Sequence, residues 1–350
     1  MCHFWGKSNY GRLCLKVQTV IFPKNAASPE SSPMTAQRGP HQNCLAFVTD
    51  AQQAPLAQFA ARQAAHVSGD RNFDILICSF EPLTLPDELT KLGIRNKVLN
   101  LRKPLTDLNL PLKWLPLEVY LRLWLPQALG DRYRRILYAD TDTYLLSPSL
   151  DRLFDVDMGP HPVAGVRDVQ QWLDLDAPIN DFAERGLPGL RFLNSGVMLM
   201  DSSRVLETDL LDRLLVISKA DTPTTHHDQS LLNLELRGEW AELHPAWNWQ
   251  WTHIFPTFTR LANPQMLHFC GPKKPWRAHQ KENRFSPALI REYQRYFARH
   301  GGDLAFHTWL PGGRRVSPMT NLRNWRWQRR HPEKLEALVG RFASPFSTLL

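Results

Sequence analysis

Short apolar runs alternate with segments of helical periodicity along the first two thirds of the chain. Residues 45–48 are apolar and lead into Thr49 and Asp50, which is the pattern of a buried strand ending in a polar loop. The full pattern predicts strands at 45–50, 73–79, 97–101, 135–140, 162–166 and 192–200, helices at 55–66 and 117–124, and a helix entered from a loop within 226–236. Such alternation is the signature of an α/β sandwich with a mainly parallel sheet, whose ligands bind beyond the carboxyl ends of the strands.

Two regions fall outside this pattern. Residues 25–34 are rich in Ser, Pro and Ala and have the character of a linker, with a translation start at Met34 as the alternative explanation. From about Arg277 onward the strand pattern disappears, and arginines and aromatic residues accumulate. We therefore predict a disordered or misannotated segment at 1–43, the main α/β domain at 44–277 and a C-terminal extension at 278–350.

The composition is that of a soluble globular protein, with 43% hydrophobic and 22% charged residues among 350. No run of 18 apolar residues predicts a membrane span, and the N-terminus lacks the continuous apolar core of a secretory signal. The five cysteines are odd in number and form no Cys-x-x-Cys pair, which favours a reducing compartment over a disulfide framework. The formal net charge of +8 favours acidic partners without choosing among phosphorylated substrates, nucleic acid and anionic lipid.

Two carboxylates stand at the end of the strand predicted at 135–140. Asp140 and Asp142 are two positions apart, so in extended backbone they point to the same face. They repel each other unless a cation lies between them, and a hard divalent cation would bind both as well as phosphate oxygens. The alternative is an ordinary turn, in which Asp142 and Thr143 make local backbone hydrogen bonds. The place after an apolar strand, at the same sheet edge as Asp50, favours a metal site.

Four blocks of this sequence resemble those of glycosyltransferase family 8, in that family's order. The blocks are Arg135–Leu146 with its continuation Leu150–Phe154, then Phe192–Asp201, Asp228–Asn233 and His268–Trp276. The opening strand Phe47–Asp50 also fits the family's uridine-binding start. The family includes glycogenin and bacterial lipopolysaccharide glucosyl- and galactosyltransferases. The resemblance covers residues 44–277.

This resemblance implies a GT-A fold, a Rossmann-like domain that binds a nucleotide-diphospho-sugar, here followed by a helical basic C-terminal extension. It implies a retaining transferase that moves a hexose from a UDP-sugar to an acceptor hydroxyl on a cell-surface glycan or glycolipid, as in lipopolysaccharide biosynthesis. By the same resemblance, Asp140, Asp142 and His268 hold a metal ion. An imidazole ligand suits Mn²⁺ better than Mg²⁺, so Mn²⁺ is the expected cofactor and Mg²⁺ the alternative.

The remaining site residues are carried over from the same blocks. Gln229 matches the residue beneath the anomeric carbon, and Asp228 matches one that holds donor-sugar hydroxyls, with a helix cap as the structural alternative for Asp228. Gly271 would let the backbone approach the diphosphate, and Lys274 would supply positive charge to the leaving group. The predicted donor-binding set is Thr49, Asp50, Arg122, Asp140, Asn194, Ser195, Gly271 and Lys274. Attack from the leaving-group face, with the departing phosphate as base, is the favoured route to retention.

Two positions depart from the family pattern, and three other functions stay open. Ala139 replaces a bulkier apolar residue, and the stretch Ala51–Ala54 lacks the aromatic residue that would stack on the uracil. A nucleotidyltransferase acting on sugar phosphates would carry a Gly-rich loop after the first strand, where this chain has none. A nucleic-acid-binding protein fits the charge, but no recognised motif supports it. A non-catalytic nucleotide-sugar-binding relative would not need the acid pair, His268 and Lys274.

The C-terminal extension pairs basic residues with apolar ones at helical spacing. Within 286–300 the apolar positions are Leu289, Ile290, Tyr293, Tyr296 and Phe297. This pattern predicts an amphipathic segment in peripheral contact with an anionic membrane. The alternative is a helical cap that buries its aromatic residues on the main domain. The expected location is cytoplasmic, with peripheral contact at the inner face of the cytoplasmic membrane and no nucleic-acid partner.

Overall fold

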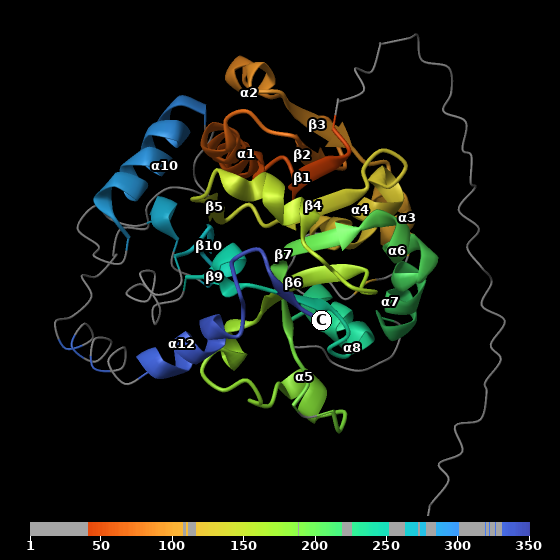
Figure 1. The fold of residues 1–350 in the computed structure, drawn as a ribbon. Helices are drawn as coiled ribbons and strands as arrows, with labels where there is room; N and C mark the ends of the chain where they lie inside the picture. The colour runs from red at the N-terminus through yellow and green to blue at the C-terminus, as the bar shows by residue number, and fades with distance from the viewer. Residues whose placement is uncertain are drawn as a thin grey trace, which may run out of the picture. The chain divides into compact units, whose positions relative to one another are not determined.

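An eight-stranded sheet forms the centre of the fold, in the strand order β11-β8-β6-β7-β4-β1-β2-β3 (Figure 1). The computed structural model describes residues 41–107, 110, 117–187, 189–218, 226–251, 263–271, 274–277, 285–300, 319, 322, 326 and 331–350, so almost all of the predicted segment 1–43 lies outside the described residues. The strands are β1 (Asn43–Val48), β2 (Asp74–Ser79), β3 (Ile94–Val98), β4 (Arg135–Ala139), β6 (Val163–Arg167), β7 (Leu193–Asp201), β8 (Ala241–Leu243) and β11 (Thr348–Leu349).

Strand direction brings several polar loops to one edge of this sheet. The pairs β1–β2, β2–β3, β1–β4 and β6–β8 are parallel, which confirms the mainly parallel sheet expected from the sequence. Strand β7 runs antiparallel to both β4 and β6. The first residues of β7 therefore lie at the same edge as the last residues of β4 and β6, and this edge carries the site described below.

Alternate residues of the strands belong to two apolar clusters. In β1, Leu45 and Phe47 pack into one cluster, whereas Cys44 and Ala46 pack into the other. This period of two is what a strand buried on both faces requires. The first cluster includes residues of α1 (Ala54–Ser68), α2 (Asp87–Lys91), α10 (Pro287–His300) and α12 (Pro332–Gly340). The second includes residues of α3 (Arg102–Asp107), α4 (Leu121–Leu129), α6 (Ser202–Glu207), α7 (Leu210–Ser218) and α8 (Asp228–Leu236).

The third strand lies three residues before its predicted position. The apolar residues of 97–101 suggested a strand there, but β3 spans Ile94–Val98 and begins after Gly93, whose φ is +74°. Among the described strands, β3 lies at the edge and pairs only with β2, so its middle residues are polar and either half-buried or exposed. Leu99 is buried beyond the end of the strand, where its backbone N–H donates to Ser79 O. Edge strands carry little apolar alternation, which is why periodicity misplaced this one.

A second, smaller sheet adjoins the carboxyl end of β4. Its order is β5-β10-β9, with β5 at Thr143–Leu145, β10 at Met266–His268 and β9 at Trp249–Gln250. His268 pairs in register with Thr143 on one side and with Gln250 on the other. Residues more than a hundred positions apart along the chain thereby come together beside Asp140 and Asp142.

The C-terminal region packs onto this core. Ile290, Tyr293, Tyr296 and Phe297 of α10 are buried, and the ring of Tyr293 lies 3.9 Å from that of Phe59 in α1, centroid to centroid. Figure 1 shows α10 alongside α1. The aromatic side chains of α10 are therefore not available to a membrane surface, and the packed-cap alternative accounts for them. Among the described residues, no helix combines the length and apolar character that a bilayer span needs.

The C-terminal strand β11 covers the edge of the sheet at β8. β11 pairs antiparallel with β8, and Glu242 of β8 is 1% exposed. Its carboxylate accepts two hydrogen bonds from Arg167, at 3.1 and 3.0 Å, and two from Arg341, at 2.9 and 3.2 Å. A buried carboxylate is tolerated when it is fully paired in this way. The strand β11 was not anticipated from the sequence, because two residues show no periodicity.

The pH dependence of stability should contain a contribution from His244. This side chain is buried at the end of β8, where Nδ1 accepts a hydrogen bond from Ala246 N at 3.1 Å, and burial lowers its pKa to about 4. Between the ordinary pKa of 6.5 and 4 the unfolded chain binds a proton that the folded chain does not. The free energy of unfolding should therefore fall as pH drops through this window, by up to about 1.4 kcal/mol per pH unit.

Urea denaturation at pH 7, 5.5 and 4.5 measures this effect. His244→Asn keeps a cap oxygen for Ala246 N but does not titrate, so its unfolding free energy should decline less steeply than that of the wild type. Equal slopes for the two proteins would contradict the assignment.

Candidate functional site

A cavity of about 450 Å³ opens at the carboxyl ends of β1 and β4. Its walls come from the loops after both strands, the start of β7, the N-terminus of α8 and the end of β10. Among the predicted site residues, it is lined by Thr49, Asp50, Arg122, Asp140, Asp142, Asn194, Ser195, Gln229, His268, Gly271 and Lys274. Asp228 is the predicted residue that does not line it.

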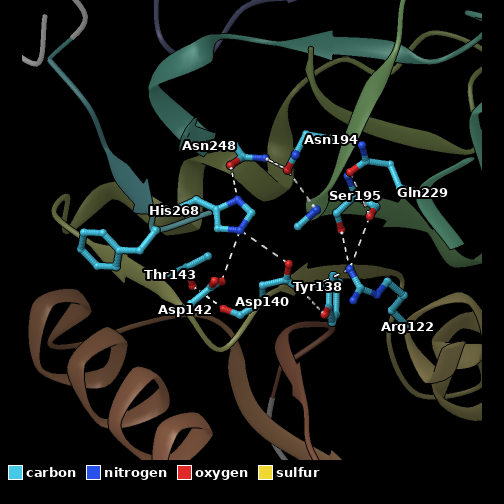
Figure 2. Close-up of polar contacts among 12 residues, drawn as sticks. Arg122, Tyr138, Asp140, Asp142, Thr143, Asn194, Ser195, Gln229, Asn248 and His268 are labelled. Carbon is cyan, nitrogen blue, oxygen red and sulfur yellow. Dashed lines mark hydrogen bonds and ion pairs between the residues drawn. The ribbon is translucent and has the colours of Figure 1, made fainter. Parts of the chain in front are cut away.

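Three ligand-type side chains converge on one side of this cavity. Atoms of Asp140, Asp142 and His268 lie within 4.8 Å of one another. The imidazole Nε2 of His268 is 3.2 Å from Asp142 Oδ1 and 3.6 Å from Asp140 Oδ2. Figure 2 shows the His268 ring facing both carboxylates. Two carboxylates and an imidazole are a suitable donor set for a divalent transition metal ion.

Two further observations fit a cation at this place. Asp142 Oδ1 is buried, and it has no hydrogen-bond donor among the described residues unless His268 Nε2, 3.2 Å away, carries a proton. Such a carboxylate oxygen is costly unless an ion completes its contacts. Gly196 of β7 lies against the cluster, and a Cβ atom there would stand 2.2 Å from His268 Cε1 and 2.8 Å from Asp140 Oδ2. Only glycine leaves these side chains room to converge.

We expect Gly196→Ala to push these side chains apart and to weaken binding of a divalent cation by at least about 100-fold, since a ligand forced aside loses several kcal/mol of stabilisation. The affinity for Mn²⁺ measures the effect. Gly340→Ala is the matched control, because a Cβ at Gly340 meets no atom within 4 Å. Wild-type Mn²⁺ affinity in Gly196→Ala would contradict the arrangement.

Two cationic side chains contact the carboxylates. Lys274 Nζ lies 2.5 Å from Asp142 Oδ2 and donates to Phe269 O at 2.6 Å. Burial alone would raise the pKa of Asp142, but Lys274 and His268 hold it well below the usual range. Arg122 is buried, with Nη1 3.1 Å from Asp140 Oδ1 and Nε 3.2 Å from Asp228 Oδ2. Burial would lower the pKa of Arg122, yet these two carboxylates raise it, so the guanidinium is charged. Its burial shows that Arg122 is not an ordinary surface arginine of the helix.

The start of β7 and the N-terminus of α8 are held together by amide groups. Ser195 N donates to Gln229 Oε1 at 3.0 Å, while Gln229 Nε2 donates to Asp168 Oδ2 at 3.3 Å. Asn194 Nδ2 donates to the same Asp168 oxygen at 3.0 Å. Asp228 is the first residue of α8, and His227, rather than Asp228, takes the cap position. Burial raises the pKa of Asp228.

The remaining wall of the cavity combines polar and aliphatic side chains. It is lined by Val48, Thr49, Asp50, Gln53, Glu118 and Val119. Asp50 Oδ1 accepts a hydrogen bond from Gln53 N at 2.6 Å, which fixes the turn into α1. Among the described lining residues, Tyr138 is the single aromatic one, and its hydroxyl bonds Asp140 at the metal side. The missing stacking residue noted in the sequence is therefore not replaced from elsewhere in the described chain.

Sequence reasoning missed four residues that shape the site. Tyr138 lies on the strand before the acid pair, Gly196 follows Asn194 and Ser195, Asp168 follows β6, and Asn248 precedes β9. Asp168 carried the same signal as Asp50 and Asp140, an acid directly after a buried strand. Asn248 carried no such signal, because its contact with His268 Nδ1 is created by the pairing of β9 with β10.

Comparison with known proteins agrees with this geometry. The profile of Glycosyl transferase family 8 matches residues 44–280. General stress protein A of Bacillus subtilis (strain 168) is 29% identical over 180 residues, which cover 46% of this chain and 60% of that protein. Glycosyltransferase GlyB of Streptococcus pneumoniae serotype 4 is 26% identical over 206 residues, covering 55% of this chain and 45% of that protein. The chain thus matches less than two thirds of the length of either relative.

Solved structures share the fold. The galactosyltransferase LgtC, in complex with donor and acceptor sugar analogues, superimposes with a TM-score of 0.59 at 18% identity, covering 76% of this chain and 100% of that one. The bifunctional glycosyltransferase WbbM, in its apo form, gives a TM-score of 0.54 at 16% identity, covering 85% of this chain and 53% of that one. The α/β architecture is therefore the GT-A fold. With its family profile matched over more than half of its length, this chain belongs to glycosyl transferase family 8.

Proposed function

We propose that this protein is a retaining hexosyltransferase that moves a hexose from a UDP-sugar to an acceptor hydroxyl with the help of a divalent metal ion, Mn²⁺ before Mg²⁺. The observation that carries the proposal is the Asp140–Asp142–His268 cluster, which opens on the same cavity as Gly271 and Lys274. Anionic ligands fit there, because the cavity pairs potential metal ligands with a lysine and with a glycine at φ +96° whose backbone a phosphate can approach.

A bound cation would neutralise the diphosphate and stabilise the charge that develops when UDP departs. Asp140, Asp142 and His268 would hold it. Lys274, which now contacts Asp142, would provide a positive charge for the same leaving group. Thr49, Asp50 and Gln53 line the same cavity, and the nucleoside would bind against them.

The donor sugar is assigned to the wall formed by Asn194, Ser195 and Gln229. Gln229 is fixed by Ser195 N and Asp168, so its side chain is oriented before a ligand binds. An amide is a poor nucleophile but can stabilise developing positive charge through its oxygen. Asp228 is buried against Arg122 and outside the cavity lining, so it would act on the donor sugar through Arg122. These features favour attack from the leaving-group face, with the departing phosphate taking the acceptor proton.

The acceptor is proposed to be a cell-surface glycan or glycolipid. The names of the structural relatives support a sugar-transfer reaction on saccharide acceptors, since LgtC is a galactosyltransferase crystallised with donor and acceptor sugar analogues. The measurement that tests the whole proposal is UDP release from a panel of UDP-hexoses, with and without Mn²⁺. A nucleotidyltransferase would release no UDP from these donors and would instead form UDP-hexose and pyrophosphate from UTP and a hexose 1-phosphate. A non-catalytic relative would bind donors without turnover.

Peripheral membrane contact stays a prediction, but the exposed arginines of α10 are now its only support among the described residues. Its aromatic component is buried, so it rests on Arg291, Arg295 and Arg299, which are exposed at a spacing of four along α10. An electrostatic contact of this kind would appear as co-sedimentation with anionic vesicles at low salt and release at high salt. No binding at low ionic strength would remove the proposal.

A further inference from the structure

A chain of buried amide groups runs from Asp168 to the imidazole of His268. Asp168 Oδ2 accepts from Asn194 Nδ2 at 3.0 Å, Asn194 Oδ1 accepts from Asn248 Nδ2 at 2.9 Å, and Asn248 Oδ1 lies 2.9 Å from His268 Nδ1. Figure 2 shows the last two contacts, with Asn248 on the side of the His268 ring that faces away from Asp142. Asn248 is fully buried, and Asp168, Asn194 and His268 are nearly so.

The direction of this chain follows from its first member. An ionised carboxylate only accepts hydrogen bonds, so Asn194 must present its NH₂ group to Asp168 and its oxygen to Asn248. Gly196 N also donates to Asn194 Oδ1, at 3.2 Å, which supports the same orientation. Asn248 must then turn its NH₂ toward Asn194 and its oxygen toward His268. Nδ1 of His268 is consequently the nitrogen that carries a proton.

The other ring nitrogen, Nε2, faces the two carboxylates, where its lone pair could bind a cation. Nε2 points at Asp142 Oδ1 and Asp140 Oδ2, at 3.2 and 3.6 Å. In the neutral ring with Nδ1 protonated, three acceptor atoms converge there, an arrangement that a cation stabilises. The reversed amide chain would offer an NH₂ group to Nδ1 and favour the tautomer with a proton on Nε2, which cannot bind a metal.

We propose that Asn248 is a positioning residue for the metal site: held in one orientation by Asp168 through Asn194, it selects the His268 tautomer whose Nε2 can bind the cation. The inference rests on the proposed metal dependence. It also explains how residues of the donor-sugar wall are connected to a metal ligand, since Asn194 and Gln229 share the carboxylate of Asp168.

The test compares Mn²⁺ affinities, measured by titration of the metal-free full-length protein without donor. Asn248→Leu keeps the branching of the side chain but removes the acceptor for Nδ1, and it should weaken Mn²⁺ binding about 10- to 100-fold, the range typical of lost partners behind a metal-binding histidine. Asn248→Asp restores an acceptor for Nδ1 and should recover most of the affinity. Asn96→Leu is the control, because Asn96 also bonds through both ends of its amide, at Ile77 O, Ser79 Oγ and Leu83 N, but far from this cavity.

Thermal unfolding separates positioning from damage to the fold. In metal-free buffer Asn248→Leu and Asn96→Leu should both unfold at lower temperature than the wild type, whereas the upward shift on adding Mn²⁺ should shrink in Asn248→Leu alone. Wild-type affinity in Asn248→Leu, or a loss that Asn248→Asp fails to recover, would overturn the inference. Absence of Mn²⁺ binding by the wild type would instead refute the metal in the proposed function.

Discussion

Asp142→Asn should abolish sugar transfer while leaving the fold intact. The substitution preserves shape but replaces a charged ligand with a neutral amide, and Asp142 Oδ1 is the buried oxygen that an ion would contact together with His268 Nε2. Losing about 4 kcal/mol of transition-state stabilisation corresponds to about a 1000-fold fall in rate. The measurement is UDP release in the presence of acceptor and Mn²⁺, together with Mn²⁺ affinity.

The thermal midpoint should change little, because removing one of two neighbouring carboxylates relieves repulsion in the metal-free protein while Lys274 loses an ion-pair partner. Asp155→Asn is the matched control: its side chain is 72% exposed and 3.7 Å from Arg134, so neither activity nor metal binding should change. Transfer by Asp142→Asn at near the wild-type rate would show that the reaction does not depend on a metal held by this residue.

The parts of the site that lie on single strands could be predicted from the sequence. Asp140 and Asp142 follow β4 directly, and Asp50 follows β1, so an apolar run ending in acids was sufficient to place them at one edge. The resemblance added His268, which joins them only because β10 pairs with β5. The twelve predicted site residues fall on this edge, with Asp228 behind the cavity wall. Their individual roles stay predictions.

What could not be predicted arises from pairing between distant segments. Asn248 is 20 positions before His268 and reaches it because β9 and β10 are parallel neighbours. The space left by Gly196 is visible only when a side chain is placed there. Likewise, the spacing of Tyr293 and Phe297 predicted an amphipathic helix correctly, but the surface that covers its apolar face, α1, lies more than 200 positions away. Periodicity identifies an apolar face without saying what packs on it.

The packing of α10 and α12 leads to the second large effect, the loss of the fold when residues 278–350 are removed. The deleted part contains the buried side chains of Phe285, Ile290, Tyr293, Tyr296, Phe297, Leu335 and Leu338. Each contributes about 1.5–3 kcal/mol by leaving water, so their sum of about 10 kcal/mol or more is comparable with the whole stability of a typical domain, about 5–15 kcal/mol. The deletion also removes Arg341 from Glu242 and exposes the edge of β8.

The truncated protein should therefore be insoluble or lack a cooperative thermal transition, measured by circular dichroism, and should not hydrolyse UDP-sugars.

Two point variants of α10 allow the contribution of its buried face to be measured separately. Tyr293→Ala should lower the free energy of unfolding by about 3–5 kcal/mol, as for other large buried aromatics, whereas Arg299→Ala, exposed on the opposite face, should have almost no effect. A truncated protein that is soluble, unfolds cooperatively and retains hydrolysis would support the boundary predicted at residue 277, with the C-terminal extension as an appendage. If instead all three results are as expected, α10 is part of the same cooperative unit as the site, and its exposed arginines belong to the outer surface of that unit.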